Sequence, residues 1–386
     1  MNSYVLKFGR RALLFKSLFV SLIVMLLILP FTVRPDSFVL HVLFSIFIYA
    51  VLGHAWNLLA GYCGLLSFGN QVYIGVGAFS MAIGSYYFHL PVWVCWPLSG
   101  LISLLFGWML AMPRRGDRAS VLRVTLTGLA LWLGYEIAIA MHPEIDVFGG
   151  AYSRRVAAVL LIFLAALPLL RLQGAYFAIA TWLIAESINS FASTWSVVGG
   201  GGGMQVRFGV GLPELYLTSL ALLVIVTLAI RALLRSKYGL ALEAVRDDEE
   251  AAMTVGVDNR VIKTGIFMLS SLITGLAAGL YYIDAIVTTP PDAFNLSWSA
   301  YLVFIVVAGG MGTLYGPIIG AVLFVAVEQL LSGAFGGGLL VLGIASILLM
   351  LFMPQGLLGV AHTLLRHKAS NRIRELRRVD QRSGPV

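Results

Sequence analysis

Carboxylates inside apolar segments are the side chains whose type and position could do chemistry in this sequence. Glu136, Glu186, Asp284 and Glu328 fall in such segments, where a carboxylate can relay protons or couple to an ion. A lone carboxyl in hydrocarbon is protonated or hydrogen-bonded, so structural satisfaction of Glu136 and Glu186 is the preferred interpretation. An ion-coupled secondary transporter, which needs such carboxylates to face a pore, is the alternative hypothesis for function.

Motifs for catalysis, nucleotide hydrolysis and metal binding are missing from the sequence. It has no Walker A loop, no GxSxG and no HExxH, and its six histidines show no metal-ligand spacing. Cys63 and Cys95 lie in or beside apolar segments and are expected to be small buried residues. We therefore predict no catalytic site, metal or cofactor. An intramembrane enzyme would need a polar cluster that the chain does not supply.

The composition is that of an integral membrane protein. Of the 386 residues, 59% are hydrophobic and only 11% are charged, whereas a soluble domain carries about 25% charged residues. The apolar runs are long, which favours membrane helices over the alternating strands of an outer-membrane barrel. We predict an all-α fold, a polytopic helical bundle with about ten to twelve transmembrane helices.

Charge decides the expected orientation. The net charge of +8 comes mostly from the termini and one internal stretch, which is positive-inside bias and no sign of nucleic-acid binding. Both termini are thus expected in the cytoplasm, with 1–361 as the transmembrane domain and 362–386 as a basic tail that binds anionic membrane lipid. The number of crossings is then even, so the chain must turn within 309–316. The expected spans are 17–33, 38–59, 71–88, 92–112, 119–141, 156–170, 174–195, 212–234, 264–287, 296–308, 317–331 and 339–352.

The chain also contains a sparse internal repeat. The stretch from Trp132 to Gly150 recurs 50 residues later, from Trp182 to Gly200, with matching Trp-Leu, Glu, Val and Gly-Gly positions. This spacing suggests that a pair of spans, about 113–165, was duplicated in tandem. Chance similarity between apolar helices is the alternative.

The longest hydrophilic stretch inside the apolar sequence is 235–263. Its charge places it in water, and its basic residues place that water on the cytoplasmic side. Asp247, with Glu250 three residues later, resembles a capping box, and Gly256 is a natural helix terminator. These signals predict a helix of about two turns across the membrane face, with Asp258 as the cap of the next helix. An ordinary solvated loop is the alternative interpretation.

Glycine clusters interrupt the apolar sequence in two places. The run 199–203 cannot hold a helix and is expected to be a flexible outer loop. The segment 61–84 is rich in glycine, which lets helices approach closely or break where they line a cavity. Its polar residues Asn70 and Gln71 lie at a depth where each needs a partner. Tight helix packing and lining of a translocation path both remain open interpretations.

Four motifs together resemble one family. They are GYCGLLSFGNQVYIGVGAFSMAIG (61–84), LRLQGAYFAIATWLIAESI (170–188), SKYGLALEAVRDDEEAAMTVGVD (236–258) and VVAGGMGTLYGPIIGAVL (306–323). In this order, over 61–353, they are similar to the permease subunits of branched-chain amino acid ABC importers, the LivM-like family. Each motif alone is weak evidence, whereas four in the same order are specific.

The resemblance implies half of a pore in the bacterial inner membrane, which works with other subunits. These are a second, LivH-like permease, two cytoplasmic ATPase subunits that use ATP, and a periplasmic or lipid-anchored substrate-binding protein. It also implies that the short cytoplasmic helix seats in a cleft of an ATPase and moves as a rigid lever. The matching positions are Glu243, Ala244, Arg246, Asp247, Glu250, Ala251 and Gly256.

The path itself is expected to be lined by residues of the glycine-rich motifs and one carboxylate. The sequence departs from the family pattern at about 113–165, where an extra pair of spans intervenes, and at Asn70, where the family often has histidine. The substrate class stays open among branched-chain and other amino acids, urea, short amides and aromatic acids. The expected path residues are Gly64, Ser67, Gly69, Asn70, Gln71, Glu186, Gly309, Gly310 and Gly312.

Overall fold

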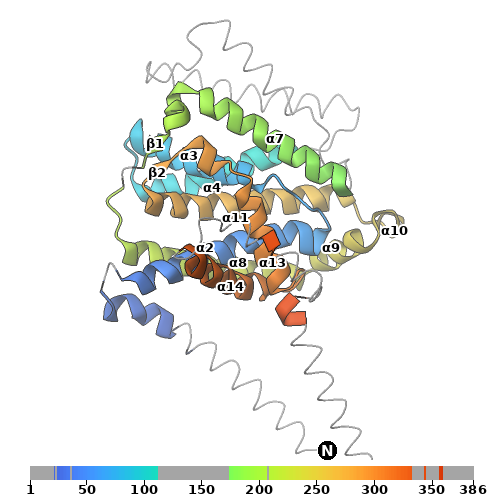
Figure 1. Ribbon diagram of the computed structural model, residues 1–386. Coiled ribbons are helices and arrows are strands. Elements are labelled where there is room, and N and C mark those ends of the chain that lie inside the picture. The colour runs from blue at the N-terminus through green and yellow to red at the C-terminus, as the bar shows by residue number, and fades with distance from the viewer. Residues whose placement is uncertain are drawn as a thin grey trace, which may run out of the picture.

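The helices of this protein lie side by side in one bundle (Figure 1). The computed structural model describes residues 21, 24–34, 37–111, 174–206, 208–332, 343–344 and 356–359. Within this part, five helical segments are long and apolar enough to cross a membrane, and they are Phe38–Tyr62, Val92–Ala111, Leu212–Leu234, Asn259–Ala285 and Pro290–Gly309. The polytopic helical fold expected from composition is confirmed.

Eight predicted spans coincide with helices, with small shifts at their ends. The predicted turn within 309–316 also forms, because one helix ends at Gly309 and the next begins at Gly316 and packs back against it. Of the predicted span 17–33, residues 21 and 24–32 are helical and residues 17–20, 22 and 23 lie outside the described residues. The total number of crossings stays a prediction, since 119–141, 156–170, most of 339–352, the suspected duplication and the basic tail also lie outside them. The helices are α2 (Phe38–Asn57), α3 (Asn70–Tyr86), α4 (Val92–Ala111), α7 (Gly174–Thr194), α8 (Leu212–Leu234), α11 (Asn259–Ala285), α13 (Ser297–Gly309) and α14 (Gly316–Ser332).

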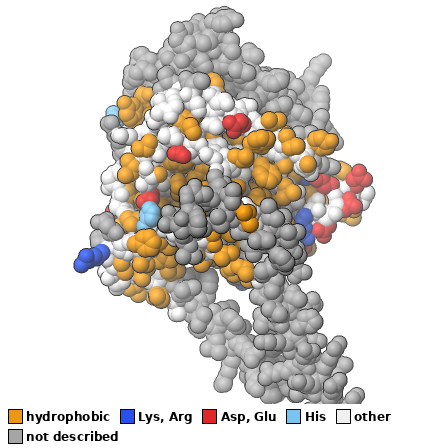
Figure 2. Space-filling model, viewed as in Figure 1, with side chains coloured by type: hydrophobic (Ala, Val, Ile, Leu, Met, Phe, Trp, Pro, Cys, Tyr) orange, Lys and Arg blue, Asp and Glu red, His pale blue; other side chains and the backbone are white. Residues whose placement is uncertain are grey.

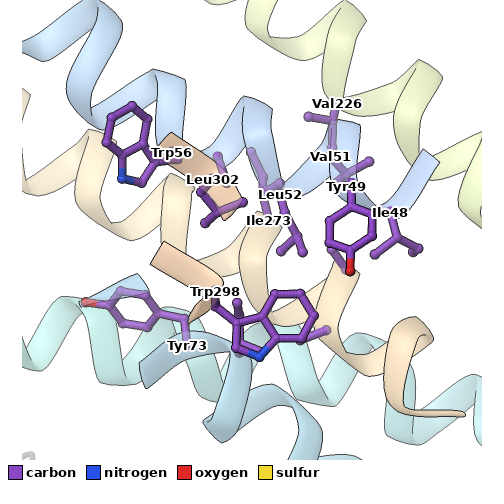
Figure 3. Close-up of a cluster of buried hydrophobic side chains, with 14 of the residues drawn as sticks. Ile48, Tyr49, Val51, Leu52, Trp56, Tyr73, Val226, Ile273, Trp298 and Leu302 are labelled. Carbon is purple, nitrogen blue, oxygen red and sulfur yellow. The ribbon is translucent and has the colours of Figure 1, made fainter. Parts of the chain in front are cut away.

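Helix α2 is the centre of the bundle. Every residue from Phe47 to Asn57 is buried, on all sides of the helix, because α2 packs against α8, α11, α13 and α14. The ring of Tyr49 lies 4.7 Å from that of Phe324 and 6.1 Å from that of Trp298, between centroids. Figure 3 shows this core, to which side chains of several helices contribute. A helix enclosed in this way fixes the positions of its neighbours.

Helices α4 and α11 pack closely along one another. Ser99 Oγ donates a hydrogen bond to the Gly275 carbonyl at 3.2 Å, and Trp96 Nε1 donates to the Leu276 carbonyl at 2.9 Å. Small residues at such a contact let two membrane helices approach, and hydrogen bonds across it add to the packing. The pair forms a firm support for α3, which contacts both helices.

One end of the bundle is closed by short irregular elements (Figure 1). Two strands pair there in antiparallel fashion, with Met204 opposite Thr288. The glycine run 199–203 is predicted to hold no helix, but Gly200–Gly202 form a 3₁₀ turn next to this ribbon, although no α-helix. The elements at this end are η4 (Ser196–Val198), η5 (Gly200–Gly202), β1 (Met204–Gln205), β2 (Val287–Thr288) and α12 (Pro290–Ala293).

The opposite end carries the hydrophilic stretch 235–263, which forms two short helices, α9 (Lys237–Asp247) and α10 (Glu249–Thr254). Ordered helices, and not an ordinary loop, therefore form here. The predicted cap is off by one residue, because Asp247 ends α9 and Asp248 caps α10. Asp248 Oδ1 accepts hydrogen bonds from the backbone N–H groups of Glu250 at 2.9 Å and Ala251 at 3.0 Å.

The end of α10 and the start of α11 follow the prediction. Gly256 has a φ of +89°, a left-handed conformation that glycine adopts without strain and that stops the helix. Asp258 Oδ1 then accepts from the backbone N–H of Arg260 at 3.0 Å and caps α11. Charged side chains gather on the face over α10 at this edge of the molecule, next to largely hydrophobic surface (Figure 2).

Candidate functional site

Helix α10 is fixed to the start of membrane helix α11 by two contacts. Lys263, only 3% exposed, forms an ion pair with Glu249. Asn259 Nδ2 donates to the backbone carbonyl of Glu249 at 2.6 Å. A lysine charge at such burial is costly without a partner, so the position of α10 is tied to that of α11.

The predicted coupling residues lie together on α9, α10 and the turn after them. All are exposed except Ala244, which is half-buried. Ala251 is exposed, whereas Ala252 is buried and packs inward. Of these two small residues, therefore, only Ala251 is accessible for close packing against another subunit. Whether this surface binds an ATPase remains a prediction.

Large apolar side chains extend this surface beyond the predicted residues. Tyr238, Leu240, Met253 and Val255 are 51%, 71%, 56% and 76% exposed, in a segment that the charge pattern places in water. Exposed apolar groups that cluster with a polar rim are typical of a protein-binding surface. The signal that could have indicated them is the presence of large apolar residues within the hydrophilic stretch.

The chain leaves regular helix directly after α2. A π-helical turn, η1 (Leu58–Tyr62), is followed by irregular backbone up to Asn70. Trp56 Nε1 holds this segment by donating to the Ser67 carbonyl at 2.8 Å. Cys63 lies at its start and is buried. The predicted path residues Gly64, Ser67 and Gly69 therefore lie on a break in the helix, where backbone groups are free to line a cavity.

The loop between α13 and α14 is bound to the same end of α2. The backbone N–H of Gly312 donates to Asn57 Oδ1 at 2.9 Å, and Asn57 Nδ2 donates to the Thr313 carbonyl at 3.0 Å. Asn57 is fully buried. It is not among the residues that the sequence predicts for the site; the signal that could have indicated it is a single amide inside the apolar span 38–59.

Arg246 brings the coupling stretch and the predicted path segments together. A Cβ built on Gly64 would lie 3.5 Å from Cγ of Arg246, and one built on Gly312 would lie 3.9 Å from its Nη1. The guanidinium is also paired with Asp247, with Nη2 2.9 Å from Oδ1. One side chain of α9 thus lies against both interrupted segments.

Asn70 and Gln71 are fully buried at the start of α3. Both amide atoms of Asn70 and Nε2 of Gln71 have no hydrogen-bond partner among the described residues, while Gln71 Oε1 accepts from the Ser299 hydroxyl. Unsatisfied buried amides are costly and uncommon. The predicted packing of Asn70 through a hydrogen bond to a neighbour is therefore not seen, and its role in the path stays a prediction.

Comparison with known proteins identifies the family. The family described as "Branched-chain amino acid transport system / permease component" matches residues 38–353. This chain belongs to that family. The permease is 28% identical to the high-affinity branched-chain amino acid transport system permease protein LivM of Salmonella typhimurium over 354 residues, which cover 92% of this chain and 77% of that protein. The LivM protein of Escherichia coli matches at 28% over 353 residues, with the same coverage.

A more distant similarity points to a second kind of permease. The probable branched-chain amino acid transport permease protein LivH of Methanocaldococcus jannaschii is 34% identical over 140 residues, which cover 33% of this chain and 42% of that protein. No solved structure matches the permease. Together with its apolar helices, these relatives make it a multi-pass inner-membrane permease subunit of an ABC importer and not an enzyme.

Within the described residues, the carboxylates that the alternative hypothesis needs lie on three different helices, Glu186 on α7, Asp284 on α11 and Glu328 on α14. Glu186 is exposed on α7, where Asn189 Nδ2 donates a hydrogen bond to it at 3.4 Å. Asp284 lies 3.5 Å from His41, near the last residues of α11 and the first residues of α2, at the end of the bundle far from the coupling stretch. Nothing on the described residues links Glu186 to the glycine loops, and its place in the path is a prediction that this geometry does not support. Glu136 lies outside the described residues. The family assignment decides against ion-coupled secondary transport.

Proposed function

We propose that this permease forms half of a translocation pathway for branched-chain amino acids or a related small amphipathic solute. Its partner in the membrane is a LivH-like permease. Two ATPase subunits bind at the α9–α10 end and use ATP, and a periplasmic or lipid-anchored binding protein delivers the substrate at the β1–β2 end. The similarity to the LivM and LivH permeases supports this assignment.

In this proposal the stretch 235–263 is the element that an ATPase moves. The observation that carries it is the attachment of α10 to α11 by the Lys263–Glu249 pair, beside an exposed surface of mixed apolar and charged residues. A short helix that is capped by Asp248 and pinned through Glu249 at the same end is held firmly at its first turn and can transmit a displacement. Closure of the ATPase dimer then turns the membrane helices as rigid bodies and changes which side of the pore is open.

The path runs along the two interrupted segments, 63–69 and 310–315. Their glycines leave backbone groups outside regular helix, which is tolerated at membrane depth where the backbone is buried in protein or lines a cavity. The unpartnered side-chain amide of Asn70 and the unpartnered Nε2 of Gln71 support a polar lining at the start of α3.

The assembly reconstituted in proteoliposomes tests both parts of the proposal. We expect ATP-dependent uptake of leucine when the cognate binding protein is present. Glu250→Lys and Gly256→Pro should lower uptake at least tenfold while membrane insertion is unchanged, because the first reverses a charge on the exposed surface and the second forbids the φ of +89°. Glu214→Lys makes the same charge change on exposed surface at the other end of the bundle and should leave association with the ATPase subunits unchanged. Normal transport by both coupling variants contradicts the proposal.

A further inference from the structure

We propose that Asn57 is a positioning residue that joins the two interrupted segments to α2, and that Arg246 carries the movement of the coupling stretch onto this joint. The joint comprises Asn57, Gly61, Gly64 and Gly312, with Arg246 over it. This inference rests on the proposed coupling role of 235–263, and adds the route by which a movement of α9 reaches the path.

The side chain of Asn57 makes a contact that few residue types can make. Its amide accepts from Gly312 N–H and donates to the Thr313 carbonyl, so one planar group satisfies two successive backbone sites. Both backbone groups lie in a loop, where no helix pairs them. Because Asn57 is fully buried, loss of the amide would leave the backbone groups without this partner.

Gly61 makes this contact possible. A Cβ at this position would lie 2.0 Å from Asn57 Oδ1 and 2.6 Å from the backbone nitrogen of Gly312. Both atoms would have to move away from such a Cβ. Any residue other than glycine would therefore separate the loop from α2. The close approach therefore depends on a glycine one turn after Asn57.

The neighbouring residue holds the other interrupted segment. Trp56 Nε1 donates to the Ser67 carbonyl, while Asn57 binds the loop between α13 and α14. Two consecutive residues at the end of α2 thus fix both segments. Since α2 is enclosed by four other helices, the two segments are expected to move with it and not independently.

Arg246 lies where a movement of α9 would act on both segments at once. Its Cγ is placed against Gly64 and its Nη1 near Gly312. α9 also contacts η1, which connects α2 to the first segment. A displacement of α9 thereby reaches the joint directly, in addition to the route through α11.

The test compares transport with ATP hydrolysis in the complete reconstituted assembly. Asn57→Leu should retain association with the ATPase subunits and hydrolyse ATP, but take up at least tenfold less leucine per ATP. Asn57→Asp keeps the acceptor for Gly312 N–H and should fall between that variant and the wild type. Asn189→Leu removes a side-chain amide from α7, away from the joint, and should behave as the wild type. Wild-type uptake per ATP in Asn57→Leu overturns the proposal, as does a proportional loss of uptake and hydrolysis.

A second variant covers the case in which Asn57→Leu does not assemble. Gly312→Ala leaves Asn57 intact but places a Cβ 3.2 Å from the Gly61 carbonyl at a φ of +73°, which displaces the loop. We expect the same loss of uptake per ATP, and full coupling in this variant overturns the proposal. If Glu250→Lys also transports normally, the proposed coupling role of 235–263 is wrong. If Asn57→Leu and Gly312→Ala are fully coupled while Glu250→Lys is impaired, only the present inference is wrong.

Cys63 provides a readout that a merely structural defect would not reproduce. It is 2% exposed and directly precedes Gly64. In a Cys95→Ala background, we expect a small maleimide to label Cys63 slowly without nucleotide and faster when ATP is trapped in the assembly. Asn57→Leu should abolish this nucleotide response while labelling still occurs. An unchanged response in that variant contradicts the proposed route.

Discussion

A single buried charge decides how the coupling stretch is attached. Lys263 is almost fully enclosed, whereas the side chain of its partner Glu249 is 30% exposed. Removal of one partner leaves the other charge behind, and the cost depends on where that charge lies. The two halves of this pair are therefore not equivalent.

We predict that Glu249→Gln destabilises the permease more than Lys263→Met. The first leaves a buried ammonium group without its partner, which costs about 3–5 kcal/mol at a fully buried pair and less here because Glu249 is partly exposed. The second leaves a carboxylate that water can reach. Unfolding of the purified permease by sodium dodecyl sulfate in mixed micelles measures the difference. Asp247→Asn, at an exposed pair worth about 0–1 kcal/mol, is the control, and equal losses for Glu249→Gln and Lys263→Met would show that the asymmetry is absent.

Helix α10 is an element of only six residues. A helix this short has few internal hydrogen bonds, so its stability in water depends on its ends and on its contacts. Asp248 satisfies two backbone N–H groups at its start, and Asn259 holds the first residue from outside. The lever thus owes its stiffness to two residues that flank it, Asp248 and Asn259.

We predict that Asp248→Ala frays α10 and lowers coupling. Loss of a cap costs about 1 kcal/mol, which corresponds to about fivefold faster exchange of the amides it protects. Hydrogen–deuterium exchange of residues 249–254 measures this, together with uptake per ATP. Asp247→Ala removes the neighbouring carboxylate, which caps nothing at α10, and should leave exchange there unchanged. If instead it is Asp247→Ala that frays α10, the capping assignment from the structure is incorrect.

At the scale of the whole molecule, the bundle has two different ends. The α9–α10 surface lies at one end, and the β1–β2 ribbon lies at the other (Figure 1). The joint at Asn57 belongs to the first end, because α9 contacts η1, which directly follows Asn57. The charge pattern assigns the first end to the cytoplasm. This polarity is what an importer requires, since it receives its substrate and its driving force on opposite sides.

We predict that single introduced cysteines report this polarity. Met253→Cys, at an exposed position of α10, should react with a membrane-impermeant maleimide in inside-out vesicles only. Gly201→Cys, where a Cβ would meet nothing within 4 Å, should react in intact spheroplasts. A parent in which the buried Cys63 and Cys95 are replaced gives the background. The reverse labelling pattern would invert the topology and remove the proposed contact with ATPases.

Structural features that depend on residues close together in the sequence were predictable from the sequence. Apolar length indicates where helices such as α8 and α11 run, because the cost of placing charge in hydrocarbon acts residue by residue. The roles of Gly256 as a helix terminator and of Asp258 as a helix cap were also predicted correctly, because each acts within one turn of the helix. The cap of α10 failed by one position, because Asp247 and Asp248 are chemically equivalent and the end of α9 decides between them.

The sequence by itself determined that this protein is a helical membrane permease and where most of its helices lie, and it predicts which stretch lies in the cytoplasm. Hydropathy, charge and local motifs are properties of short segments, so they can be read along the chain. Only the tertiary structure decided that Asn57 binds Gly312, 255 residues away, and that Arg246 lies over both interrupted segments. Such contacts follow from how the helices pack around α2, and packing is a property of the whole bundle.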